Sequence, residues 1–162
     1  WRDQGMGVIP DLGSHLLDLT DFLFDARPRE LRTWACHRFE NRAFDHVVLR
    51  AHGPPASQYE ISLLSWRNTF SADLIGERGS AHVHCLCKWG PSSLTVRRRI
   101  LPSGRPTEEV QVVERPDPTW ELEYRDFKEN CATGRTNLDK DRWINTVLRG
   151  LQPQRKESAW AA

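Results

Sequence analysis

Hydrophobic and polar positions follow two different periods along this chain, and the changes of period divide it into three parts. Apolar residues recur at helical spacing over residues 5–25, alternate with period two over about seven short segments, and return to helical spacing near the end. The expected strands cover residues 29–40, 45–51, 58–66, 70–75, 79–87, 93–100 and 108–114, and the two later helices cover residues 117–134 and 138–151.

The connections between the expected strands are too short to hold a crossover helix. Short connections join antiparallel neighbours, whereas parallel neighbours need a long crossover. The order of one helix, a block of strands and two helices is typical of the α+β class. We therefore expect an open, mostly antiparallel sheet of about seven strands with helices packed on one face. Residues 1–152 would form this domain, and residues 153–162 would be a frayed tail.

Two of the three expected helices have an apolar stripe that we expect to face a core. In the first helix the stripe is Leu12, Leu16, Leu19 and Leu23, and in the second it is Trp120, Tyr124, Phe127 and Cys131. In the first strand, alternation puts Leu31, Thr33, Ala35 and His37 on one side.

Some strands are apolar on both sides, as in the run Val47-Val48-Leu49. A sheet covered on one face needs only one apolar side. Two explanations stay open: imperfect alternation, or an open sheet face that packs on a second copy of the chain to make an oligomer.

Three side chains of the first helix could carry chemistry. Asp11, His15 and Asp18 stand at i, i+4 and i+7, so a helix places them on one face. A histidine can move a proton near neutral pH, and a carboxylate one turn away can orient its ring. On spacing alone, a solvated polar helix face is the favoured explanation, and a site that moves protons is the alternative.

Composition excludes several classes of function. The net charge of +1 gives no electrostatic reason to bind nucleic acid or an anionic membrane. No apolar run reaches the roughly 18 residues that a transmembrane helix needs. The four cysteines, at 36, 85, 87 and 131, are irregularly spaced, and we expect reduced thiols and a cytoplasmic location.

Neither a metal site nor a phosphate site is expected in this chain. His82 and His84 share one side of a strand while Cys85 and Cys87 share the other, so one ion cannot collect both pairs. The run Arg97-Arg98-Arg99 lies within a strand and fits a solvated or subunit-contact face.

The pair Gly5-Met6-Gly7 resembles the start of a dinucleotide-binding loop. The third glycine of G-x-G-x-x-G would fall at residue 10, which is Pro10, and no expected strand precedes the pair. We interpret the glycines as a flexible entry into the first helix.

Three stretches of the chain resemble one known family. Residues 7–19 (GVIPDLGSHLLDL) resemble the G-x-L/V-x-D-x-G-x-H-x-x-D segment that opens the C-terminal domain of the Gfo/Idh/MocA family of NAD(P)-dependent sugar and polyol oxidoreductases. Residues 72–81 (ADLIGERGSA) are similar to its I-x-G-x-x-G-S hairpin, and residues 119–134 (TWELEYRDFKENCATG) to its F-x-x-x-I-x-x-G helix. The three occur in the family's order.

The resemblance implies a function as well as a fold. His15 matches the family's catalytic acid/base, Asp11 the carboxylate that accompanies it and contacts substrate, and Asp18 a third position of the same substrate-binding motif. The cofactor would be NAD or NADP, and the substrate a sugar, cyclitol or related polyol. The family's open sheet face commonly makes a homo-oligomer.

The family's N-terminal Rossmann domain has no counterpart in these residues. We therefore expect the substrate-binding and acid/base half of an oxidoreductase, as a fragment or a natively truncated chain, and inactive alone. Two alternatives remain: a non-catalytic oligomerisation or scaffold module, and an NAD-dependent glycosidase branch of the same family.

Overall fold

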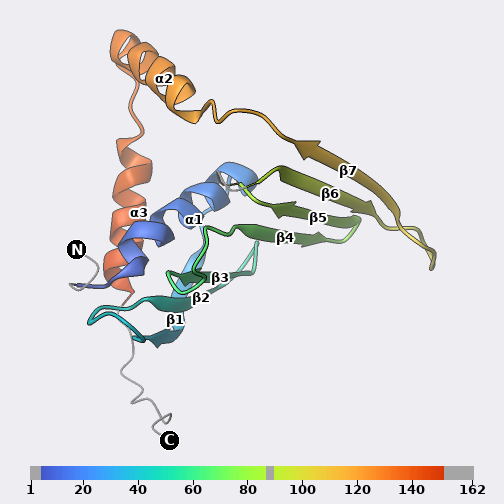
Figure 1. The fold of residues 1–162 in the computed structure, drawn as a ribbon, viewed down its shortest axis with the longest axis horizontal. Coiled ribbons are helices and arrows are strands. Elements are labelled where there is room, and N and C mark those ends of the chain that lie inside the picture. Colours follow the sequence, from blue (N-terminus) through green and yellow to red (C-terminus); the bar gives the residue numbers. More distant parts are fainter. Residues whose placement is uncertain (1–4, 87–89, 152–162) are drawn as a thin grey trace, which may run out of the picture. The chain divides into compact units, whose positions relative to one another are not determined.

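The computed structural model describes residues 5–86 and 90–151, in which the elements follow the expected order (Figure 1). The helices are α1 (Val8–Phe24), α2 (Thr119–Thr133) and α3 (Leu138–Gly150). The strands are β1 (Arg29–His37), β2 (His46–His52), β3 (Ser57–Ser62), β4 (Ser71–Gly76), β5 (Gly79–His84), β6 (Ser92–Arg98) and β7 (Thr107–Val113). All paired strands are antiparallel, which confirms the α+β class. The expected frayed tail, residues 153–162, lies outside the described ranges.

The strands form two sheets, where the sequence predicts one. Their orders are β1-β2-β3 and β4-β5-β6-β7. The strand expected over residues 58–66 ends at Ser62, because the Ser62 hydroxyl accepts the backbone N–H of Leu64 at 3.1 Å and so turns the chain. The Leu63 N–H is already donated to the Asp45 carbonyl at 2.9 Å. β3 therefore ends at Ser62, and its sheet does not include β4.

Contacts within the chain gather in two compact units. Unit 1 is Trp1–Leu64 with Arg135–Ala162, and unit 2 is Ser65–Gly134.

The core of unit 1 lies between α1, α3 and the β1-β2-β3 sheet, and α1 and α3 lie side by side (Figure 1). Its buried apolar residues are Val8, Ile9, Leu17, Phe44, Val47, Leu49, Tyr59, Ile61, Ile144, Leu148 and Leu151. Each large aliphatic side chain buried there contributes roughly 1.5–3 kcal/mol of transfer free energy. The Thr20 and Tyr59 hydroxyls meet at 3.0 Å, so both buried polar groups are paired.

The core-facing side of α1 is not the leucine stripe that the sequence predicts. The residues of the helix that are buried are Val8, Ile9, Gly13, Leu17 and Thr20. Leu23 is 44% exposed, and Leu12 and Leu16 only flank the core. The buried face is turned by about a quarter of a turn from the leucine stripe, at 3.6 residues per turn.

Gly13 explains this rotation. A Cβ at this position would lie 3.3 Å from Ile61 Cδ1 and 3.5 Å from Leu148 Cδ2. The helix therefore turns its smallest residue toward β3 and α3, where it can approach them most closely. A prediction based on hydrophobic residues gives glycine little weight. The core-facing side of α1 is therefore placed wrongly on the leucine stripe.

Gly7 is a packed position, so the prediction of a flexible entry is wrong there. Its φ is +60°, and a Cβ would lie 2.0 Å from the Phe44 carbonyl oxygen. That same oxygen accepts the Val8 N–H at 2.9 Å. The first turn of α1 is thereby tied to the segment before β2.

A bulge in β1 changes which residues face the core. Thr33 pairs with Leu49 but Ala35 pairs with Val48, so Trp34 is the extra residue. Beyond the bulge, Cys36 stands opposite the buried Val47 and packs against the core. The predicted alternation through Ala35 and His37 is therefore wrong beyond Trp34.

Unit 2 contains the β4-β5-β6-β7 sheet and α2, and none of its residues within 65–86 and 90–134 is buried. The stripe of α2 that we expect to face a core is exposed: Trp120 is 71% and Phe127 61% accessible. Periodicity identifies an apolar stripe but not what covers it. In the described part of the chain, no helix combines the length and apolar character needed to cross a membrane.

Candidate functional site

Asp11, His15 and Asp18 lie on the side of α1 that is turned away from the core. Their helical positions are opposite the buried face of Ile9, Gly13 and Leu17. His15 is exposed, and Asp11 and Asp18 are half-buried. Residues four apart on a helix have Cβ atoms about 5–6 Å from each other. The row is therefore rigidly backed by the core and open to an incoming group.

Asp11 and His15 are near neighbours without a direct bond. No hydrogen bond or ion pair among residues 5–86 and 90–151 joins their side chains. The Ser14 hydroxyl donates to the Asp11 backbone carbonyl at 2.8 Å, which leaves the Asp11 carboxylate to other partners. The arrangement offers one carboxylate acceptor and one imidazole, one helical turn apart, to a hydroxyl placed between them.

Asp18 has a partner that sequence reasoning missed. Lys140 of α3 places its Nζ 2.5 Å from Asp18 Oδ1. The hydrogen bond to Asp18 raises the pKa of Lys140 above its usual range against the opposing effect of burial, and the charges of Asp18, Asp21 and Asp141 act in the same direction. Lys140 is thus held as a cation beside the row, and only contact between α1 and α3 could reveal it.

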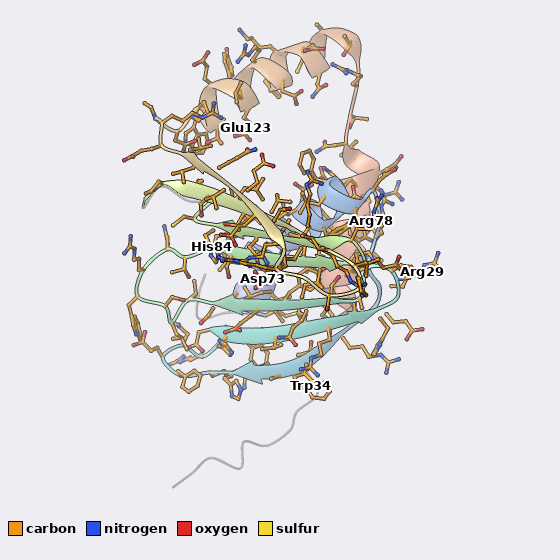
Figure 2. The ribbon with its side chains drawn as sticks, turned by 90° about the vertical axis from the view of Figure 1, so that its right-hand side faces the viewer. Arg29, Trp34, Asp73, Arg78, His84 and Glu123 are labelled. Carbon is orange, nitrogen blue, oxygen red and sulfur yellow. The ribbon has the colours of Figure 1, made fainter. Side chains whose placement is uncertain are left out.

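Two surface hollows in unit 1 lie elsewhere. One, of about 400 Å³, is lined at the β1 bulge by Leu31, Arg32, Thr33, Trp34, Arg50, His52, Gly150 and Leu151. The other, of about 590 Å³, is lined by Asp21, Asp25, Ala26, Arg27, Arg29 and Pro54 after α1. Trp34 and Arg29 mark the two places in Figure 2. Asp11, His15 and Asp18 line neither of these two hollows.

The other residues that the sequence singled out as possible ligands belong to unit 2. No group of three or more histidine, cysteine or acidic residues within the described ranges is arranged to hold a metal ion. The strand of the histidine and cysteine pairs ends at His84, and Cys87 lies outside the described residues. In the arginine run, Arg97 Nε donates to Glu108 Oε2 at 2.6 Å.

The thiols that the structure describes, Cys36, Cys85 and Cys131, are free. Burial raises the pKa of Cys36, and the charge of Arg38 opposes that rise. A raised pKa lowers the thiolate fraction, so Cys36 is a packing residue more than a nucleophile.

Asp45 is a fully buried carboxylate that no sequence signal pointed to. Phe39, Glu40 and Asn41 donate their backbone N–H groups to it, with a shortest distance of 2.7 Å from Glu40 N to Oδ2. Burial acts to raise the pKa of Asp45, but these N–H donors together lower it below the ordinary value. Its place within the turn before β2 makes it a structural anchor.

No protein-family model, curated protein or solved structure matches the chain. The assignment of a function therefore rests on the row of α1 and on the resemblance of its motif.

Proposed function

We propose that the chain is the substrate-binding and acid/base half of an NAD(P)-dependent oxidoreductase that acts on a hydroxyl of a sugar, cyclitol or related polyol. The observation that carries the proposal is the position of His15: it is exposed on a helix whose opposite face is fixed to the core of unit 1. The core fixes the helix that carries this imidazole, so the ring is already in position when a substrate binds.

The roles follow from what each group can do. His15 takes the proton of the substrate hydroxyl during oxidation and returns it during reduction. Asp11, one turn earlier, accepts a hydrogen bond from a neighbouring substrate hydroxyl. Asp18 and the cation of Lys140 supply an acceptor and a donor at the far end of the row.

The dinucleotide does not fit the glycines of this chain. The space beside Gly7 is filled by the Phe44 carbonyl, so its backbone cannot approach a pyrophosphate. We assign the binding of NAD or NADP to a Rossmann domain outside these residues.

The alternative of a non-catalytic oligomerisation module is favoured by a different observation. Unit 2 exposes large apolar side chains, among them Trp66, Ile75, Val110, Val112, Trp120, Tyr124 and Phe127. Such surfaces commonly bind another protein. We infer a homo-oligomer through the open sheet face, compatible with either reading, and a cytoplasmic location for its reduced thiols. An NAD-dependent glycosidase of the same family remains a variant of the oxidoreductase proposal.

The parent enzyme with His15→Ala tests the main proposal. General acid–base groups contribute about 10²–10⁴-fold, so oxidation of polyol, followed by NAD(P)H absorbance, should fall at least a hundredfold. His52→Ala, which removes another exposed imidazole, is the matched control and should keep full activity. Retention of more than about a tenth of the turnover in His15→Ala would refute the role of His15.

Two further observations separate the alternatives. A strand–G-x-G-x-x-G–helix unit encoded upstream of Trp1 would support the enzyme, and a start codon at Trp1 would refute it. For the oligomer, light scattering that gives a monomer across micromolar concentrations would count against a contact through the sheet face.

A further inference from the structure

Three polar side chains on the sheet of unit 2 form a continuous hydrogen-bonded chain. Ser80 Oγ lies 2.8 Å from His82 Nε2, and His82 Nδ1 lies 2.6 Å from Asp73 Oδ1. Ser80 and His82 are two residues apart on β5, and Asp73 of β4 is the direct antiparallel partner of His82. Asp73 and His84 mark these two neighbouring strands in Figure 2. A serine, a histidine and a carboxylate are therefore joined in the order that an activated nucleophile requires.

The carboxylate decides which imidazole nitrogen carries the proton. A carboxylate only accepts hydrogen bonds, so the bond between Asp73 and His82 requires a proton on Nδ1. In the neutral ring Nε2 is then a lone-pair acceptor, and the group that faces it is the Ser80 hydroxyl. Asp73 thus holds the imidazole in the tautomer that can take the hydroxyl proton of Ser80.

The two cross-strand neighbours of Ser80 complete its surroundings. Ile75 of β4 and Arg97 of β6 are its direct partners on either side, so their side chains share its face. Ile75 is 86% exposed and offers apolar contact to an acyl chain. Arg97 uses Nε to bind Glu108, and the remaining N–H donors of a guanidinium can stabilise a negative oxygen beside Ser80.

We propose that Ser80 is an activated nucleophile that accepts the acyl group of small carboxylic esters, with His82 as the base and Asp73 as the positioning residue of the base. The substrate class follows from an open sheet face that admits short acyl groups and has one apolar and one cationic neighbour. This activity is separate from the oxidoreductase proposal, because its residues lie in unit 2 and the row of α1 lies in unit 1.

Besides the protein itself, the reaction needs only an ester and a water molecule. Ser80 Oγ attacks the carbonyl carbon while His82 Nε2 takes the hydroxyl proton, and that proton passes to the departing alkoxide as the bond to the alcohol breaks. Water then attacks the acyl ester with His82 taking its proton. The proton returns to Ser80 Oγ, and the carboxylic acid is released.

The solvent exposure of His82 and Asp73 determines how fast we expect ester hydrolysis to be. The side chain of His82 is 21% exposed and that of Asp73 is 61% exposed, so a reagent can reach the chain of hydrogen bonds but water competes for it. Pre-organisation in a dry site strengthens such catalysis. We therefore expect slow turnover of activated esters and efficient covalent capture by a reagent selective for activated serines.

The experiment uses the whole chain of 162 residues with p-nitrophenyl acetate and, separately, an alkyl fluorophosphonate. In the second reagent Ser80 Oγ displaces fluoride from phosphorus, and mass spectrometry of a digest locates the adduct. Ser80→Ala should abolish the adduct, and His82→Gln should slow its formation at least about a hundredfold. Asp73→Asn should slow it at least about tenfold, and Asp73→Glu should recover part of the rate.

The matched control is Ser93→Ala. Ser93 lies on the same sheet face with His84 as its direct cross-strand partner, and no carboxylate within residues 5–86 and 90–151 is hydrogen-bonded to either of them. The adduct rate should stay unchanged in this variant, while circular dichroism reports that each variant is folded. An unlabelled Ser80, a Ser93 labelled as fast as Ser80, or equal rates for Asp73→Asn and Asp73→Glu would overturn the proposal.

Discussion

Replacement of Asp45 by asparagine should destabilise unit 1 strongly although it changes the volume of the side chain little. The carboxylate accepts N–H groups from Phe39, Glu40 and Asn41, and its side chain is fully buried. Hydrogen bonds to a charged acceptor contribute roughly 1 kcal/mol more than bonds to a neutral one. Three such bonds therefore place the loss of free energy of unfolding in Asp45→Asn at about 2–4 kcal/mol.

The same bonds predict how the loss depends on pH. The N–H donors outweigh burial, so the folded-state pKa of Asp45 lies below the ordinary value of 3.8. A group with a depressed pKa contributes stability that is fully present above the unfolded-state pKa and is lost as the pH falls through the folded-state pKa. The difference between wild type and Asp45→Asn should be constant at neutral pH and shrink below 3.8.

Urea unfolding followed by circular dichroism over a series of pH values measures this difference. Glu60→Gln is the control, because it removes an exposed carboxylate from the neighbouring β3 and should change stability by no more than about 0.5 kcal/mol. If Asp45→Asn matched wild type at neutral pH, or if the difference persisted far below pH 3.8, the carboxylate would not be the anchor.

Other variants test the remaining features of unit 1. Gly7→Ala would drive a Cβ to 2.0 Å from the Phe44 carbonyl oxygen and should cost more than about 3 kcal/mol, measured by urea unfolding; a wild-type midpoint would refute the close approach. Thr20→Val breaks the hydroxyl pair with Tyr59 and should lower the free energy of unfolding by about 1–2 kcal/mol, with Thr20→Ser as the variant that keeps the bond. Lys140→Met should cost less than about 1 kcal/mol by thermal unfolding, since the pair with Asp18 is partly exposed; a loss above about 2 kcal/mol would contradict this.

Local sequence patterns predict the helices and strands of this chain more completely than they predict the contacts between those elements. The order of helices and strands follows from changes of period, and α2 ends at Gly134, whose positive φ glycine adopts without strain. The face of α1 was mispredicted because the core prefers the smallest residue, Gly13, at the closest approach. The bulge at Trp34 has no local signal, and one extra residue reverses the alternation beyond it.

The candidate site likewise combines residues that a local pattern predicts with residues that only contacts between elements bring together. The row of Asp11, His15 and Asp18 follows from helical spacing alone, because all its members lie on one element. Lys140 joins it only through the packing of α3 on α1, a tertiary contact that leaves no mark in a single sequence. Asp73 meets His82 through the register of the β4–β5 hairpin, in which Gly76 pairs with Gly79.

The discontinuity of unit 1 bears on how the chain folds during synthesis. Its core needs Ile144, Leu148 and Leu151, which leave the ribosome after every residue of unit 2. Until then α1 and the β1-β2-β3 sheet lack the helix that covers part of their apolar surface, and they remain open to misassembly or chaperone binding. Because the entropy of closing a loop grows only slowly with its length, the intervening unit delays this closure in time more than it opposes it in free energy.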